Sequence, residues 1–136
     1  MSIIGTREQT ATIANGASLS DALELDGHSV LRIAMPVAWT AADLTFQVSD
    51  DAGTTFRNVY WDWGPEMVVD AAAAMTIELS PFVQLHHIDQ IKVRSGTAGT
   101  PVNQGDIRLV VLAVGVKDLQ WIRCRGSFQS INILMD

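Results

Sequence analysis

The sequence predicts an all-β protein, with one domain folded as a single antiparallel β-sandwich or jelly roll of about eight strands. Short apolar or alternating runs recur along the 136 residues, and turn-forming pairs separate them. No segment sustains the 3.6-residue periodicity of a helix. Hydrophobic residues make up 48% of the chain and charged residues only 18%, which provides a real core and excludes a disordered chain. No linker or repeat divides residues 1–136, so we expect one domain.

The first strands are each ended by a turn signal. The run Thr10–Ala14 precedes Asn15-Gly16, a pair typical of tight turns. The next expected strand contains Leu19, Leu23 and Leu25 at even spacing and ends at the turn pair Asp26-Gly27. The strand after it, Val30–Met35, is mostly apolar and ends at Pro36, which has no N–H to donate to a neighbouring strand.

A hairpin with a recognisable turn follows. The runs Leu44–Val48 and Phe56–Trp61 flank a stretch with the pattern Ser-x-Asp-x-Gly-x-Thr-aromatic, which resembles the Asp-box turn of sialidases. We expect Asp51 to accept backbone hydrogen bonds, and Ser49 and Thr55 to satisfy other polar groups of the turn. Gly53 should adopt a positive φ, and the ring of Phe56 should pack at the base of the turn.

The second half of the chain also consists of short expected strands separated by turns. Ile88–Ser95 alternates between apolar and polar residues, and Ile107–Val114 is the most apolar run and therefore the expected central strand. The alanines at 71–74 and the segment Pro81–Leu85 each suit a single helical turn. The remaining expected strands are Met67–Val69, Met75–Leu79, Leu119–Cys124 and Ser130–Leu134.

The chain lacks the residues that an enzyme of the Asp-box kind requires. A sialidase needs an arginine cluster, a tyrosine nucleophile and an acid, whereas the arginines are scattered and Tyr60 is the only tyrosine. The single cysteine, Cys124, has no nucleophile motif around it. His86 and His87 are adjacent and would point to opposite faces of a strand, which disfavours a shared metal ion. We expect no catalytic residue, no metal and no cofactor.

Charge and hydropathy limit the kinds of partner that the chain can bind. The formal net charge is −6, and phosphate contacts need clustered Lys and Arg, so we expect no nucleic-acid binding. The longest apolar run, Leu109–Val116, is too short to span a bilayer, and we expect no membrane segment.

Aromatic residues gather after the Asp-box-like turn. If the strand continued, Trp61 and Trp63 would share one face and Tyr60 would occupy the other, while Trp39 lies upstream. One interpretation is core packing combined with a subunit interface, where Trp and Tyr are enriched. The alternative is a stacking platform for sugar rings, with Asp62 and Glu66 binding hydroxyls.

The order of these motifs resembles a group of small structural proteins of tailed bacteriophages, prophages and gene transfer agents. The resemblance runs over roughly residues 10–112. Its segments are Thr12–Ala22, Met35–Gln47, the turn at 49–56, Lys92–Thr97 and Pro101–Gln104. It implies a non-enzymatic head decoration or spike protein located in the virion, with the capsid shell as partner. A carbohydrate-binding or host-attachment module on the head or tail is the alternative function.

The C-terminal segment 116–136 lies beyond this resemblance. It ends in the apolar residues Ile131, Ile133, Leu134 and Met135, which would be costly to expose. A terminal apolar strand can pair with a neighbour's sheet edge. We therefore expect a homo-oligomer in which this segment serves assembly.

Overall fold

The structure, a computed structural model, describes residues 6–80 and 85–115. Within these ranges the protein is all-β, and every strand pair is antiparallel. The strands are β1 (Thr6–Ile13), β2 (Leu23–Ala34), β3 (Leu44–Ser49), β4 (Arg57–Asn58), β5 (Thr76–Glu78), β6 (Ile88–Ser95) and β7 (Arg108–Gly115). The two expected C-terminal strands, Leu119–Cys124 and Ser130–Leu134, lie outside the described residues.

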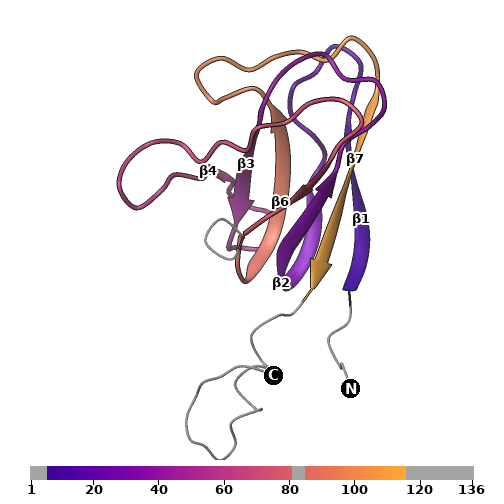
Figure 1. Ribbon diagram of the computed structural model, residues 1–136. Coiled ribbons are helices and arrows are strands. Elements are labelled where there is room, and N and C mark those ends of the chain that lie inside the picture. The colour runs from indigo at the N-terminus through magenta and orange to yellow at the C-terminus, as the bar shows by residue number, and fades with distance from the viewer. Residues whose placement is uncertain (1–5, 81–84, 116–136) are drawn as a thin grey trace, which may run out of the picture.

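The strands form one sheet that curls into a half-barrel (Figure 1). The spatial order is β1-β7-β2-β6-β3-β4, and β5 pairs with β2 outside this path. As Figure 1 shows, β1, β7 and β2 stand on one side of the curl and β6, β3 and β4 on the other. Most of the long loops gather at the end of the half-barrel away from Thr6 and Gly115.

Strand β2 belongs to both sides because it reverses direction in the middle. The predicted turn at Asp26-Gly27 is confirmed: both residues adopt positive φ, 53° and 80°, as a tight hairpin turn requires. Before the turn the chain runs antiparallel to β1, because Thr12, Gln9 and Arg7 hydrogen-bond in that order to Asp21, Glu24 and Asp26. After the turn it runs back parallel to β1, because residues 29–34 pair antiparallel with β7, which itself pairs antiparallel with β1. The first half of β2 consequently pairs with β6, whereas the second half pairs with β7 and β5.

The core fills the inside of the curl. Alternate residues of the paired strands point inward and are fully buried, as the pleat requires. The largest of the buried apolar side chains are Phe46, Ile13, Leu25, Ile33, Leu44, Ile91 and Leu112. The expected central position of the most apolar run is confirmed, because β7 has a strand on each side.

The other predicted strands agree with the structure to different extents. Ile88–Ser95 is confirmed with its predicted bounds as β6. The run Phe56–Trp61 shortens to the two residues of β4, and Met67–Val69 contributes only an isolated bridge from Val69 to Leu44. The alanines at 71–74 form a turn rather than helix, and residues 81–84 of the other expected helical turn lie outside the described ranges.

A buried glutamine holds the loops together at one end of the half-barrel. Gln104 is 1% exposed, and its side chain makes four hydrogen bonds. Its Oε1 accepts from the Thr40 N–H (2.8 Å) and from Arg108 Nε (3.0 Å), while its Nε2 donates to the Thr40 carbonyl (3.0 Å) and to Ser95 Oγ (2.6 Å). The buried amide thereby ties the loop at Thr40 to the last residue of β6 and the first residue of β7.

We expect Gln104→Ala to lower the free energy of unfolding by about 2–4 kcal/mol, because it creates a cavity and leaves buried polar partners unsatisfied. Denaturant titration measures the change. The exposed neighbour provides a control, and Asn103→Ala should stay within about 0.5 kcal/mol of the wild type. Equal stability of the two variants would contradict this role of Gln104.

Candidate functional site

The Asp-box-like turn is closed by its own side chains. Asp51 Oδ1 accepts hydrogen bonds from the Thr55 N–H (2.8 Å) and the Ser49 hydroxyl (2.8 Å). The same hydroxyl oxygen accepts from the Gly53 N–H (2.9 Å). These bonds favour the ionised carboxylate: first the Thr55 N–H and then the Ser49 hydroxyl hold the pKa of Asp51 below its usual value.

The turn is also fixed against strand β6. Gly53 has a φ of 87°, and a Cβ at this position would lie 2.7 Å from Gln90 Oε1. The half-buried Phe56 ring lies beneath Lys92, whose Nζ is 4.4 Å from the ring centroid, a cation–π distance. The turn therefore sets where the chain enters the next segment.

That next segment is a projecting hairpin of residues 60–66, which we call the aromatic hairpin. Tyr60 and Glu66 form an antiparallel bridge, the Trp61 N–H donates to the Pro65 carbonyl (2.9 Å), and the Gly64 N–H donates to the Trp61 carbonyl (3.0 Å). The prediction that Trp61 and Trp63 share a strand face is wrong, because the chain reverses between them.

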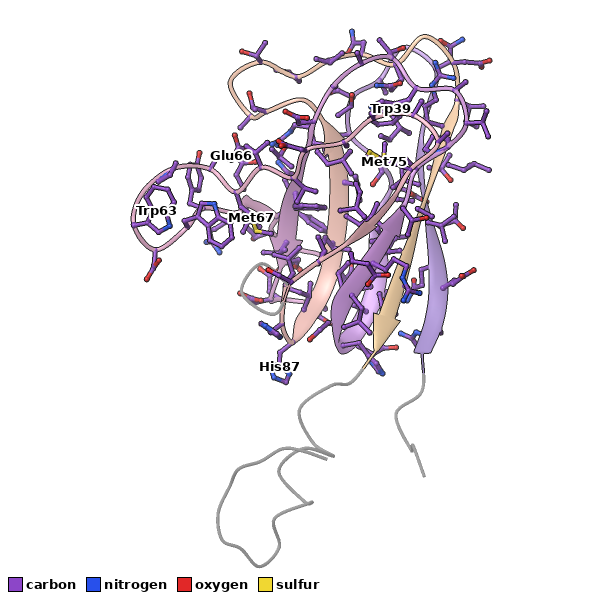
Figure 2. The ribbon with its side chains drawn as sticks, viewed as in Figure 1. Trp39, Trp63, Glu66, Met67, Met75 and His87 are labelled. Carbon is purple, nitrogen blue, oxygen red and sulfur yellow. The ribbon has the colours of Figure 1, made fainter. Side chains whose placement is uncertain are left out.

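The aromatic hairpin presents its tip to solvent. Trp63 is 73% exposed and Tyr60 is 56% exposed. Figure 2 shows Trp63 at the tip, on the side away from β6, with Glu66 and Met67 closer to the sheet. Trp61 is half-buried and packs against the core. Trp39 lies elsewhere, half-buried, with its Nε1 donating to the Ala42 carbonyl (2.9 Å).

A buried charge anchors the base of this hairpin. Arg94 is 7% exposed, and its Nη1 lies 3.2 Å from Glu66 Oε2. Its Nη1 also donates to Thr45 Oγ1 (3.2 Å), and its Nη2 donates to Asn58 Oδ1 (2.7 Å). Glu66 in turn accepts from the Ala98 N–H at 3.1 Å. We call these residues, Arg94, Glu66, Thr45 and Asn58, the arginine network.

The arginine network was not predicted. The alternation in Ile91–Arg94 points Arg94 to the outer face of the sheet, where exposure is expected. The structure buries this side chain because the aromatic hairpin and the loop 96–101 cover that face. The available signal was that polar residues occupy the outer face of three neighbouring strands, Thr45 on β3, Asn58 on β4 and Arg94 on β6.

An open groove of about 340 Å³ runs beside the aromatic hairpin. One wall is the extended segment 67–70, and the other wall is β5 with the two residues that follow it. Trp61 contributes from the hairpin itself. The lining residues are Trp61, Met67, Val68, Val69, Asp70, Ile77, Glu78, Leu79 and Ser80.

The structure brings together only some of the predicted contact residues. Tyr60, Trp61 and Trp63 belong to one hairpin, whereas Trp39 is separate. Glu66, predicted as a hydroxyl ligand for sugars, is occupied by Arg94 and the Ala98 N–H. The predicted C-terminal contacts, Ile131, Ile133, Leu134 and Met135, lie outside the described residues.

Within residues 6–80 and 85–115, no three His, Cys, Asp or Glu side chains are grouped so that they could hold a metal ion. The same part of the chain contains no helix long and apolar enough to cross a membrane.

Comparisons with known proteins return nothing: no protein-family model, no curated protein and no solved structure matches this chain. The aromatic hairpin, the groove and the arginine network must therefore be interpreted from their own geometry.

Breaking the arginine network should destabilise the fold strongly. We expect Arg94→Met to lower the free energy of unfolding by about 3–5 kcal/mol, since it leaves a largely buried carboxylate without its cation. The exposed pair Arg32–Glu78 provides the matched control, and Arg32→Met should cost less than about 1 kcal/mol. Denaturant titration compares the two variants, and equal losses would contradict the anchoring role of Arg94.

The Asp51 carboxylate should make stability depend on acid. Because its pKa in the folded protein lies below the usual 3.8, its contribution is complete above that value and is lost as the pH falls through the folded-state pKa. We expect the stability difference between the wild type and Asp51→Asn to shrink as pH falls below about 4. Thermal unfolding at several pH values measures it. Asp50→Asn, at the exposed neighbouring residue, provides the control and should stay within about 0.5 kcal/mol of the wild type at neutral pH.

Proposed function

We propose that this protein is a non-enzymatic structural component of a tailed-phage virion, acting in the head as a decoration or spike protein. The virion setting rests on the resemblance of residues 10–112 to small phage structural proteins. Binding through protein–protein contacts rests on one observation, the exposed Trp63 at the tip of a braced hairpin. The partners proposed are other copies of the chain and the capsid shell.

The tip of the hairpin has the properties of an interface anchor. Exposed tryptophan and tyrosine are among the residues that contribute most to binding when a partner buries them. The backbone of the hairpin is already ordered by its bridge, by its turn and by the arginine network. Binding therefore requires little additional ordering of the chain, which lowers the entropic cost of association.

The charge of the chain supports a place on the outside of the shell. A protein with a formal net charge of −6 is repelled by packaged DNA, whose phosphates carry the same sign. The proposal accordingly includes no nucleic acid and no membrane among the partners.

We propose the complete fold as a β-sandwich or jelly roll of about eight strands. The seven described strands form a half-barrel with an open seam between the segment 67–70 and β5. The C-terminal segment 116–136, in which two short strands are predicted, is proposed to serve assembly.

A second function, binding of a host surface glycan, is favoured by the grouping of Tyr60, Asp62 and Trp63 at the tip. Sugar rings stack on exposed aromatic faces, and carboxylates accept hydrogen bonds from hydroxyls. The engagement of Glu66 by Arg94 removes one of the two expected carboxylates from this role. Protein assembly is therefore the better supported function.

The head-decoration function predicts that Trp63→Ala reduces the occupancy of the protein on particles by at least about tenfold, as loss of an anchor residue requires. Particles that lack the protein are mixed with purified wild type or variant, and the bound copies are counted after sedimentation and located by imaging. Val37→Ala, at a valine that is 85% exposed on another loop, provides the control and should bind as the wild type does.

The outcomes separate the two functions. Wild-type protein that binds neither heads nor tails would overturn the virion proposal. Unchanged occupancy of the Trp63→Ala variant would overturn the anchoring role of the hairpin. Binding of host polysaccharide in a titration, lost in Trp63→Ala while occupancy is kept, would assign the hairpin to glycan attachment instead.

A further inference from the structure

The groove beside the aromatic hairpin separates two backbone edges that run in opposite directions and do not pair with each other within the described residues. On one wall, Val69 exchanges both hydrogen bonds with Leu44 at 2.9 Å, so the flanking residues Val68 and Asp70 direct their backbone groups the opposite way. On the other wall, Ile77 pairs with Ile33 of β2. The backbone groups of Thr76 and Glu78 consequently face the groove.

These edges remain available within the part of the chain that the structure describes. No backbone hydrogen bond joins Val68 or Asp70 to Thr76 or Glu78. An unpaired edge is a template for an additional strand. Between the edges, half-buried Trp61 and buried Met67 provide an apolar surface on which inserted side chains can pack.

We infer that this groove receives the C-terminal segment Ile131–Met135 of a neighbouring copy, which adds to the edge of β5 as an extended strand. This inference rests on the proposed assembly function and names the partner surface for it. Residues 131, 133 and 135 would point into the groove, because side chains alternate along a strand. The side chains of Asn132 and Leu134 would face outward.

Size and composition fit this occupant. Five extended residues span about 17 Å, which matches the four or five residues of each wall. A volume of about 340 Å³ suits a few aliphatic side chains and no larger body. The segment Ile131–Met135 contains four apolar residues in five and no charge.

Charge also favours attraction between the two parts. Residues 116–136 contain three of the nine Lys and Arg residues but only two of the fifteen Asp and Glu residues. The preceding part of the chain is therefore more acidic than the whole. Asp70 lines the groove, as does Glu78, whose carboxylate is paired with Arg32. Copies that would repel each other through their acidic bodies gain an attraction through the basic tail.

The tail is long enough to reach the groove of a neighbouring copy as well as the groove of its own chain. Gly115 pairs with Ser29 of β2, and Glu78 pairs with Arg32, on the other side of β2. The groove of the same chain is thus about 10–15 Å away, from strand spacing and rise. The fifteen residues 116–130 can extend to about 50 Å, several times that distance.

Complementation between two full-length variants tests the inference. One variant carries Ile133→Asp, which places a charge in the apolar tail and leaves the groove intact. The other carries Val68→Asp, which places a charge in the groove and leaves the tail intact. By analytical ultracentrifugation, the wild type should self-associate, and each variant alone should self-associate at least about a hundredfold more weakly, because a charge would enter an apolar contact. An equimolar mixture should form a heterodimer, since one intact tail meets one intact groove.

Two controls add the same charge where the inference predicts no effect. Asn132→Asp changes an outward residue of the tail, and Val37→Asp changes an exposed valine outside the groove; both should associate as the wild type does. Oligomers that survive both Ile133→Asp and Val68→Asp would overturn the inference. The inference would also be overturned if the equimolar mixture stayed monomeric or if the wild type were monomeric. Either result would show that the tail docks within its own chain or does not dock at all. These measurements use no particles, so they fail or succeed separately from the Trp63→Ala test on virions.

Discussion

The buried ion pair between Arg94 and Glu66 determines where the aromatic hairpin lies. A guanidinium that is removed from water is tolerated only when its donors are used, and here Glu66, Thr45 and Asn58 accept from it. Because Glu66 also accepts from the Ala98 N–H, the pair joins the hairpin, the loop 96–101 and strands β3, β4 and β6. The exposed position of Trp63 follows from this ion pair, because Arg94 holds the Glu66 carboxylate at the end of the hairpin.

The reversal within β2 is the second constraint, and it positions one wall of the groove. The positive φ values at Asp26 and Gly27 turn the strand back, so that its first half pairs with β6 and its second half pairs with β7 and β5. The second half of β2 therefore holds β5, whereas Leu44 of β3 holds the segment 67–70 through Val69. Because different strands hold the two walls, the groove can lie open between them.

The sequence was sufficient for the fold class, because period-2 alternation and turn pairs are local signals. It placed β6 correctly and located the Asp-box-like turn through residues that bond to one another within seven positions. It also located the reversal at Asp26-Gly27, because that turn depends on two adjacent residues with positive φ. It failed where distant residues decide: Arg94 has the spacing of a surface residue but is covered by a loop. Gln104 likewise gives no local sign that its amide binds the loop at Thr40, the end of β6 and the start of β7.

The aromatic hairpin and the groove are two surfaces of one structural unit. Trp61 lines the groove while its neighbours in the chain form the exposed tip, and its N–H is bonded within the hairpin. A strand that entered the groove would pack against Trp61 and so restrict the hairpin further. Contact between copies at the groove would thus reduce the conformational freedom that the tip loses when it meets a shell or another partner. Self-assembly and attachment through Trp63 would then favour each other, with Trp61 as the physical link between them.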